Sequence, residues 1–466
     1  MTTRRANSKP REAGPASAAS DGVRYRRLPT GAHGLTREQV ELDQRERLRS
    51  AMIELIAERG YPAVRIHDLT QLAHVSRPTF YNLFDDKEEL LLSAYEDIAG
   101  RTTKRIAEAY ASGDSPEESV QLALRAFSEL AAAEPQAMTL ALLGTFGAGP
   151  RALQRRAGTL NALEEIVEAG RSSLASEHPR DFTAKFVIGG IREVSAARLR
   201  DGRAPELVEL GHDLATWAGS YPAALPLGLD GPPRVLPRGG GSPLPAPAPR
   251  PEGRLPSGRH DLPREDVVKS QRERIVYATA AIVAEKGFAG LTIPEIASRA
   301  NVSHETFYEM YKTKHDAFLG AQKIGLHQAL RVTANAVASA GPEWADSVAA
   351  GMSALLQYVC SEPEHAHLTL VDTFGASPRA IEIRDRALAS FTEFLRPGYE
   401  LAPAGVEVPQ VAAEAVAGGV WQVMHHYIEQ QRLDELCDAT PQLVYLTLSP
   451  FLGPERAADV GRLTTG

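Results

Sequence analysis

Cysteine is nearly absent from this chain, which has only Cys360 and Cys437 among its 466 residues. Two cysteines are too few for a disulfide scaffold or for a cysteine cluster that binds zinc. Long apolar runs are lacking as well, because no window holds the roughly 18 apolar residues that a transmembrane helix needs. The arginines near the N-terminus have no apolar segment behind them, as a secretory signal would. We therefore expect a cytoplasmic protein that does not enter a membrane.

Positive charge is not in excess, since 51 Lys and Arg stand against 59 Asp and Glu, a formal net charge of -8 at pH 7. This balance argues against a protein that coats nucleic acid over its whole surface, although it allows a local basic face. The motifs G-x-S-x-G and H-E-x-x-H and a Gly-rich phosphate loop after a strand are also missing. The sequence therefore predicts neither an enzyme nor a bound cofactor.

The chain contains an internal repeat. Residues 37–99 align without a gap with residues 264–326, and 21 of these 63 positions are identical. The correspondence continues further along, because TFGAGPRA at Thr145–Ala152 returns as TFGASPRA at Thr373–Ala380. Two related units therefore share one chain.

Proline marks the boundary between the units, since 12 of the 32 prolines lie between Pro222 and Pro263. We interpret this segment as an extended, semi-rigid linker. The N-terminal segment has little apolar content and predicts a disordered arm, which is either a solvated tail or an arm that follows the DNA backbone or minor groove. Its basic residues are Arg4, Arg5, Lys9, Arg11, Arg24, Arg26 and Arg27.

The predicted domains are the arm (1–36), a first helix-turn-helix (37–95), a first helical bundle (96–221), the linker (222–263), a second helix-turn-helix (264–322) and a second helical bundle (323–457).

Hydrophobic periodicity predicts helices throughout both units, and no alternating strand pattern occurs, so the fold class is all-α. One apolar stripe of an amphipathic helix consists of Leu48, Met52, Leu55 and Ile56, at i, i+4, i+7 and i+8. Gly60 and Gly287 follow this helix in the two copies, where a C-terminal glycine adopts a left-handed conformation. In the second copy Thr292 and Glu295 predict a capping box at the start of the next helix.

A short turn then leads to a third, shorter helix in each unit. Ser76 and Ser303 stand where an N-cap serine begins a helix. The third helix is predicted at Arg77–Phe84 in the first unit and at His304–Tyr311 in the second. Two short helices joined by a turn predict a helix-turn-helix, whose second helix fits the major groove of about 12 Å width.

The residues of this third helix carry a family resemblance. Val75-Ser76-x-x-Thr79-Phe80-Tyr81-x-x-Phe84-x-x-Lys87 resembles the recognition segment of TetR/AcrR-type transcriptional regulators, and Val302-Ser303-x-x-Thr306-Phe307-Tyr308-x-x-Tyr311-x-x-Lys314 repeats it. The resemblance covers about 60 residues in each copy strongly and the C-terminal parts more weakly. It implies two tandem TetR-like units, each with a DNA-binding domain and a C-terminal bundle for ligand binding and dimerisation.

Carried over to the first unit, the resemblance implies that Arg77, Pro78 and Thr79 point into the groove and that Asn82 reaches a base or a phosphate. Tyr81, Lys87 and Arg65 would then bind phosphates. The DNA-binding residues predicted here are Arg65, Ser76, Arg77, Pro78, Thr79, Tyr81, Asn82 and Lys87. In the second unit His304 and Glu305 would face the groove, and the full set is Thr292, Ser303, His304, Glu305, Thr306, Tyr308 and Lys314. We expect Phe80, Phe84, Phe307 and Tyr311 to lie in the core instead.

The chain departs from the family pattern in two places. The turn has His74 and Asn301 where the family has glycine, and both residue types tolerate a left-handed backbone. Glu305 and Glu309 replace Pro78 and Asn82 in the second copy. Two carboxylates weaken attraction to phosphate, although glutamate can accept a hydrogen bond from cytosine. We expect the two copies to prefer different DNA sequences, with the second binding more weakly.

The sequence says less about the packing and the ligands of the C-terminal bundles. The pairs Gly189-Gly190 and Gly418-Gly419 allow close helix packing. Two units of one chain would pair as a pseudo-dimer, or two chains would associate as a homodimer. The histidines His365, His367, His425 and His426 lack convincing ligand spacing, so we interpret them as surface or pocket residues rather than a metal site. Five large residues would line an apolar pocket or, more simply, belong to the bundle core: Trp217, Trp344, Trp421, Tyr358 and Met424.

Two functions follow from these observations. The first is a sequence-specific regulator of transcription, a repressor by family habit, whose partners are a double-stranded operator with an imperfect palindrome and a small-molecule effector. The second is a ligand-binding or protein-interaction module in which one or both helix-turn-helix domains have lost DNA binding.

Overall fold

The computed structural model describes residues 36–145, 148–171, 182–221 and 263–462. The chain divides into two compact units, Met1–Glu96 and Asp97–Gly466, which we describe separately as unit 1 and unit 2. Every regular element in the described residues is helical, and none is a strand. The all-α prediction is therefore confirmed. The predicted basic arm and most of the predicted linker lie outside the described residues.

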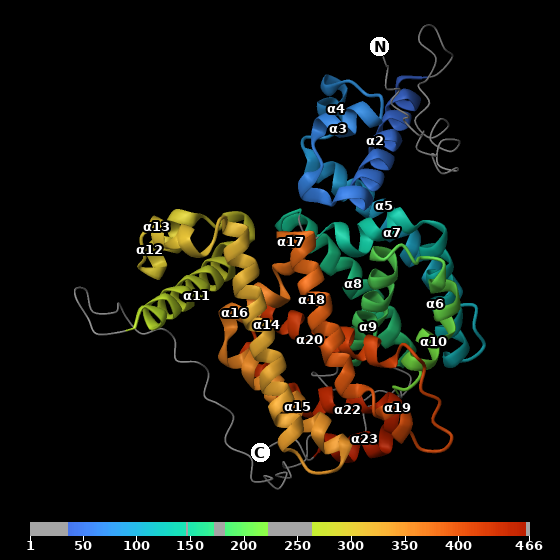
Figure 1. Cartoon of the computed structure of the whole chain (residues 1–466). Helices are drawn as coiled ribbons and strands as arrows, with labels where there is room; N and C mark the ends of the chain where they lie inside the picture. Colours follow the sequence, from blue (N-terminus) through green and yellow to red (C-terminus); the bar gives the residue numbers. More distant parts are fainter. Residues whose placement is uncertain (1–35, 146–147, 172–181, 222–262, 463–466) are drawn as a thin grey trace, which may run out of the picture. The chain divides into compact units, whose positions relative to one another are not determined.

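Unit 1 contains the first helix-turn-helix (Figure 1). Its elements are α2 (Arg37–Arg59), the short η1 (Tyr61–Ala63), α3 (Ile66–Leu72), α4 (Arg77–Leu83) and the start of α5 (Lys87–Tyr110). Leu48, Phe80 and Leu90, from α2, α4 and α5, are fully buried. These side chains hold the short α4 in place, because a helix of seven residues gains little stability from its own hydrogen bonds.

The serine N-caps predicted from the sequence are present. The Ser76 hydroxyl accepts a hydrogen bond from the Thr79 backbone N–H at 3.1 Å, and the Ser303 hydroxyl accepts one from Thr306 at 3.0 Å. The predicted capping box at Thr292 is wrong, because α12 (Ile293–Ala300) begins there without a side-chain cap. Glu295 points away from the N-cap and pairs with Lys286 at 2.5 Å instead.

Gly60 ends α2, and Gly287 interrupts the helical backbone near the end of α11 (Arg264–Gly290), at the two glycines that the sequence singles out. Their φ angles are +74° and +69°, with ψ at 153° and 170°. This region of positive φ with extended ψ is essentially restricted to glycine, so the conformation differs from the helical left-handed one expected. The chain therefore leaves the helix sharply and turns toward the next one.

Unit 2 begins with the bundle of the first copy. It contains the rest of α5 and α6 (Pro116–Ala133), α7 (Pro135–Thr139), η2 (Leu140–Gly144), α8 (Pro150–Arg171), α9 (Thr183–Arg200) and α10 (Glu206–Ala218). Trp217 on α10 is fully buried and packs near Phe186 of α9, with ring centroids 6.1 Å apart. This tryptophan is thus part of the bundle core.

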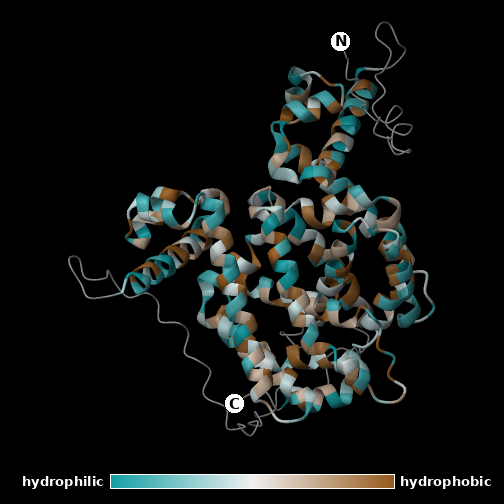
Figure 2. Ribbon diagram, in the orientation of Figure 1, coloured by the Kyte–Doolittle hydropathy of each residue, from teal (hydrophilic) through white to brown (hydrophobic). Residues whose placement is uncertain are grey.

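The second copy also lies entirely in unit 2. Its helix-turn-helix consists of α11 (Arg264–Gly290), α12, α13 (His304–Met310) and the start of α14 (Lys314–Ser339). Its bundle adds α15 (Trp344–Ser361), α16 (Pro363–Leu370), α17 (Thr373–Ala376), α18 (Pro378–Thr392), η3 (Glu393–Leu395), α19 (Gly398–Leu401), α20 (Ala412–Glu429), α21 (Leu433–Leu436), η4 (Cys437–Ala439), α22 (Thr440–Leu452) and α23 (Pro454–Gly461). Figure 2 shows hydrophobic and hydrophilic residues interleaved along α11.

Helices α9 and α20, which occupy equivalent places in the two copies, pack against each other (Figure 1). A Cβ atom added to Gly189 would lie 2.4 Å from Cβ of Gln422, and one added to Gly418 would lie 2.3 Å from Cβ of Glu193. No larger residue fits at that separation, so the glycine pairs allow the close approach that the sequence predicts. None of the described helices is long and apolar enough to span a membrane.

Candidate nucleic-acid interface

The predicted groove-facing residues of the first copy share one exposed surface of α4. Arg77, Pro78 and Asn82 are exposed, and Thr79 is half-buried next to the Ser76 cap. Tyr81 is 46% exposed, while its neighbour Phe80 is fully buried. Successive helical residues diverge by about 100°, so Phe80 anchors α4 and Tyr81 points outward.

The second copy repeats this arrangement on α13. His304 and Glu305 are exposed at its start, and Tyr308 is 55% exposed. Phe307 is fully buried, as expected of the core residue of this helix. Tyr311 is half-buried and packs against the same core. The two recognition helices therefore present equivalent positions to solvent with different chemistry.

The turns before α4 and α13 adopt the left-handed backbone that the sequence allows. His74 has φ 51° and Asn301 has φ 52°. An arginine of the preceding long helix holds each turn. The buried Arg47 donates to the Ala73 carbonyl at 2.6 Å, and the half-buried Arg274 donates to the Ala300 carbonyl at 2.9 Å. Sequence reasoning missed these two arginines, although they align with each other in the repeat.

The two lysines predicted to bind phosphate point inward in the structure. The Lys87 ammonium donates to the carbonyls of Tyr61 and Val64 at 3.1 and 2.9 Å, and it lies 4.0 Å from the centre of the Tyr61 ring. Burial lowers the pKa of Lys87. Lys314 likewise donates to the Leu291 carbonyl at 2.8 Å. Both lysines therefore brace the segment before the second helix.

Arg65 and Thr292 occupy the N-cap position of the second helix in their copies. Both residues are exposed, and the Arg65 backbone N–H donates to Asp68 at 3.3 Å. Arg65 therefore stands at the positive N-terminal end of α3, where an anion is favoured.

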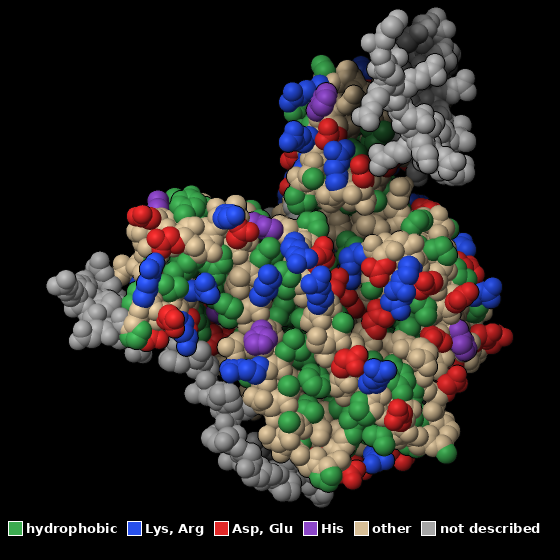
Figure 3. All heavy atoms as spheres, viewed as in Figure 1, with side chains coloured by type: hydrophobic (Ala, Val, Ile, Leu, Met, Phe, Trp, Pro, Cys, Tyr) green, Lys and Arg blue, Asp and Glu red, His purple; other side chains and the backbone are tan. Residues whose placement is uncertain are grey.

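The electrostatic character of the two recognition helices differs. Arg77 lies over the ring of Tyr81, 5.8 Å from its centre, so α4 begins with a cation held against an aromatic face. Glu305 and Glu309 of α13 are both exposed. Figure 3 shows acidic side chains on the surface of the α12–α13 region. We expect stronger attraction between α4 and a polyanion than between α13 and the same polyanion.

The second helix-turn-helix shares its hydrophobic core with the bundle of its own copy. Leu368 of α16 and Ala380 of α18 belong to the same buried cluster as α11 and α13. The Asp372 carboxylate accepts a hydrogen bond from the Phe288 backbone N–H at 3.0 Å. In the repeat alignment Asp372 corresponds to Gly144, which has no side chain to make this bond. The link was not predicted, but a comparison of the two copies could have revealed it.

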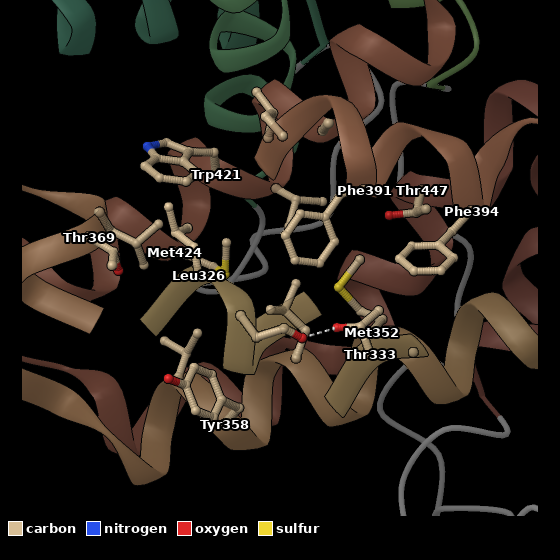
Figure 4. Close-up of a pocket in the computed structure, with 18 of the residues that line it drawn as sticks. Leu326, Thr333, Met352, Tyr358, Thr369, Phe391, Phe394, Trp421, Met424 and Thr447 are labelled. Atoms are coloured by element: carbon tan, nitrogen blue, oxygen red, sulfur yellow. Dashed lines mark hydrogen bonds between the residues drawn. The ribbon is translucent and has the colours of Figure 1, made fainter. Parts of the chain in front are cut away.

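A cavity of about 100 Å³ lies inside the second bundle (Figure 4). Trp421, Tyr358 and Met424 line it, so these predicted pocket residues do meet. Its hydroxyl groups mostly donate to carbonyls, as Tyr358 does to Gly325 at 3.1 Å. The buried Thr447 hydroxyl is an exception, since it has no hydrogen-bond partner. An apolar molecule with one polar atom matches this lining.

Ion pairs join the two copies around α9 and α20. Arg198 contacts both carboxylate oxygens of Glu414, at 2.7 and 2.8 Å. Arg384, only 1% exposed, contacts both oxygens of Glu193 at 2.5 Å. Burial raises the pKa of Glu193, but the charge and hydrogen bonds of Arg384 outweigh it and hold this pKa below its usual value. The pair is therefore ionised at neutral pH.

Of the four histidines predicted to be surface or pocket residues, His365 and His425 are buried rather than at the surface. His365 lines the cavity and packs edge-on against Tyr277 of α11, with ring centroids 4.8 Å apart. His425 lies 3.2 Å from Glu429. Within the described ranges, no group of three or more His, Cys, Asp or Glu side chains is arranged to hold a metal ion.

A comparison with protein families agrees with the two helix-turn-helix domains. The family model for bacterial regulatory proteins of the tetR family matches twice, at residues 48–94 and 275–320. No curated protein matches the chain. Among solved structures, the transcriptional regulator FadR from Bacillus subtilis in complex with stearoyl-CoA has 21% identity and a TM-score of 0.34, and the alignment covers 37% of this chain and 96% of that one. A TetR family transcription regulator from Marinobacter aquaeolei VT8 has 20% identity and a TM-score of 0.33, with 38% and 96% covered.

The two family matches begin within α2 and α11 and end within α5 and α14, so each spans one complete helix-turn-helix. They coincide with the repeat seen in the sequence and with the two exposed recognition helices. Each helix-turn-helix of this chain thus matches the model of the tetR family of bacterial regulatory proteins, and the chain carries two TetR-like units in tandem.

Proposed function

We propose that this protein represses transcription by binding one operator with both of its recognition helices, α4 and α13. The observation that carries the proposal is the repeated geometry, with an exposed tyrosine and an exposed N-terminal half on each helix above a buried phenylalanine. The operator is an imperfect palindrome, because Arg77-Pro78 and His304-Glu305 meet the bases of its two halves. Repression is the role that the family resemblance suggests.

The two copies of one chain act together as a pseudo-dimer in this proposal. The packing of α9 on α20 and the Glu193–Arg384 pair support it. Removing one partner of a buried ion pair leaves an unpaired buried charge and costs about 3–5 kcal/mol. The Glu193–Arg384 pair therefore favours the packing of the two copies against each other, because this packing brings both charges together.

The charge pattern also favours pairing of unlike copies over pairing of two first copies. The residue equivalent to Glu414 in the first copy is Lys185, and the residue equivalent to Arg198 in the second copy is Tyr427. If α9 met another α9, Arg198 would face Lys185, and like charges would repel. If α20 met another α20, Glu414 would face Tyr427 and lose its ion pair. At the Arg198 position, only the mixed pair joins opposite charges.

Charge exchange tests this pairing. Arg198→Glu in the full chain places two carboxylates together and lowers the thermal unfolding midpoint of unit 2. Adding Glu414→Arg restores opposite charges and recovers the midpoint. If the double variant is no more stable than the sum of the two single changes predicts, the two side chains do not interact and the pairing is wrong.

An apolar effector in the cavity of the second bundle regulates operator binding in this proposal. Thermal unfolding of the full chain, measured with a panel of small apolar compounds, identifies a ligand by its stabilising effect. Val348→Phe, on the cavity wall, abolishes that effect by filling the space, whereas Val208→Phe on the exposed surface of α10 preserves it. A ligand that stabilises both variants equally binds elsewhere.

Selection of bound sequences from random DNA with the full-length protein tests the function as a whole. Two different half-site motifs at a fixed spacing are the expected result. Enrichment of a single motif supports the second candidate function, in which α13 no longer binds DNA; the exposed Glu305 and Glu309 favour that candidate. Without any enriched motif, at low and moderate salt and with the stabilising compounds present or absent, DNA binding is ruled out.

A further inference from the structure

The two cysteines of the chain, separated by 77 residues, meet in the second bundle. Cys360 lies in the last turn of α15, and Cys437 begins η4, which joins α21 to α22. Their sulfur atoms are 2.7 Å apart. A disulfide has a sulfur–sulfur distance of about 2.05 Å, so a small approach of the two side chains is enough to form the bond.

Both thiols are half-buried, so a small oxidant in solvent can reach them. The hydrogen bond between the two sulfur atoms lowers the pKa of Cys437, against the opposing effects of burial and of Asp438. The thiolate is the reactive form of cysteine, and an adjacent second thiol resolves an oxidised first one. The geometry thus supplies an attacking and a resolving cysteine.

We propose that Cys360 and Cys437 form a reversible intramolecular disulfide when the protein meets a peroxide. The Cys437 thiolate attacks one oxygen of hydrogen peroxide and breaks the O–O bond, which gives a sulfenic acid and, after protonation, one water. The Cys360 sulfur then attacks the sulfenic sulfur, loses its proton and releases the second water. In total two thiols and one peroxide give one disulfide and two waters, so sulfur is oxidised and the peroxide is reduced.

The disulfide ties together segments that form the walls of the cavity. Tyr358 and Val359, which line it, directly precede Cys360 on α15. On the other side, Met424 of α20 and Thr447 of α22 also line it, and η4 lies between these two helices. Oxidation therefore fixes α15 relative to the α20–α22 connection. An effect on effector binding rests on the proposed function, whereas formation of the disulfide does not.

Thiol counting on the full-length protein tests the proposal. The protein is treated with one equivalent of hydrogen peroxide, unfolded, alkylated with N-ethylmaleimide and weighed by mass spectrometry. We expect two adducts before oxidation, and after it none, with a mass lower by two hydrogen atoms and a single-chain species on a non-reducing gel. Dithiothreitol returns both adducts. Two adducts after peroxide, or a disulfide between chains, would overturn the proposal.

The variants Cys360→Ser and Cys437→Ser separate this reaction from ordinary oxidation. Each retains one thiol, and neither can lose two hydrogens within the chain. The wild-type measurement decides the proposal even if a variant folds poorly. Thiol counting uses no DNA. Its result therefore stays separate from the test of operator binding, and either proposal can fail without the other. If the disulfide fixes α15, the oxidised form should have a higher thermal unfolding midpoint, and dithiothreitol should reverse the increase. An unchanged midpoint would contradict this effect on α15.

Discussion

Neighbouring residues on the recognition helices take opposite roles. Phe80 is fully buried and Tyr81 is largely exposed, and Phe307 and Tyr308 repeat the contrast. The buried ring fixes the helix on its domain, and the exposed ring is free to meet a phosphate or a base. The same two-residue pattern in both copies is the residue-level basis of the proposed function.

Arg77 is the residue whose loss should weaken DNA binding most in the first copy. In Arg77→Ala the affinity for the selected operator should fall about 5- to 150-fold, because a cation facing base edges or phosphates contributes about 1–3 kcal/mol. Fluorescence anisotropy with labelled operator at two salt concentrations measures this loss. Arg125→Ala, an exposed arginine on α6 that pairs with Glu129, is the matched control and should bind normally. Equal affinities of the wild type, Arg77→Ala and Arg125→Ala would show that Arg77 of α4 does not contact the operator.

Arg47 should stabilise the first helix-turn-helix by holding its turn. In Arg47→Met the carbonyls of Ala73 and His74 lose a charged donor, and the local free energy of opening should fall by about 1–3 kcal/mol. Hydrogen exchange of the backbone amides in α3 and α4 reports this opening. Arg59→Met removes an exposed arginine from the same helix and should change the opening by less than about 0.5 kcal/mol. Unchanged exchange in Arg47→Met contradicts the clamp.

His426 on α20 should make unit 2 less stable in acid. Burial lowers its pKa from 6.5 to about 4, the charge of Lys185 adds to this, and Glu429 opposes it; Arg432 and His425 are the other charged neighbours. Below pH 6.5 the unfolded chain therefore binds a proton that the folded chain rejects. The free energy of unfolding should fall by about 1 kcal/mol on going from neutral pH to about pH 5.5.

Urea unfolding across this pH range measures the effect, and His426→Gln should flatten the dependence. His212→Gln, at an exposed position on α10, is the control and should retain the wild-type slope. A slope in His426→Gln as steep as in the wild type would assign the acid sensitivity to other groups. The buried His425, whose pKa burial also lowers, contributes with the same sign.

At the scale of elements, the close packing of α9 and α20 depends on glycine. A Cβ at Gly418 would overlap Cβ of Glu193, which sits next to the backbone and cannot swing away. Gly418→Ala should therefore lower the thermal midpoint of unit 2, although alanine favours a helix by about 1 kcal/mol over glycine. Gly100→Ala in α5, where nothing lies within 4 Å of the added atom, should be neutral or stabilising. Differential scanning calorimetry compares the two, and equal midpoints would exclude the close contact.

The lysines and Glu295 show why some element-level predictions stay untested or are wrong. A motif gives the residue type but not the side-chain direction. Lys87 and Lys314 bond to carbonyls of the preceding turn, so their part in phosphate binding remains a prediction. Glu295 has the spacing of a capping box, but Lys286 of the neighbouring helix offers an opposite charge and draws the carboxylate away.

At the scale of the whole molecule, the proposed pairing within one chain leaves α9 and α20 covered by each other. Light scattering after size exclusion should therefore give the mass of one chain, 50.3 kDa, without DNA. Arg198→Glu should weaken the pairing and add larger species, because the freed faces of α9 and α20 become available to other chains. A wild-type mass of two chains would show that the copies pair between molecules.

The sequence by itself determined the repeat, the helical class, the helix ends at glycine and serine, and the division of each recognition helix into buried and exposed residues. These features depend on neighbours within one or two helical turns, which a local pattern reports directly. Only the tertiary structure decided that Glu193 meets Arg384, that Asp372 holds the second helix-turn-helix, and that Cys360 meets Cys437. Those contacts join segments between 77 and 191 residues apart, and their energy depends on how whole helices pack, which no local spacing records.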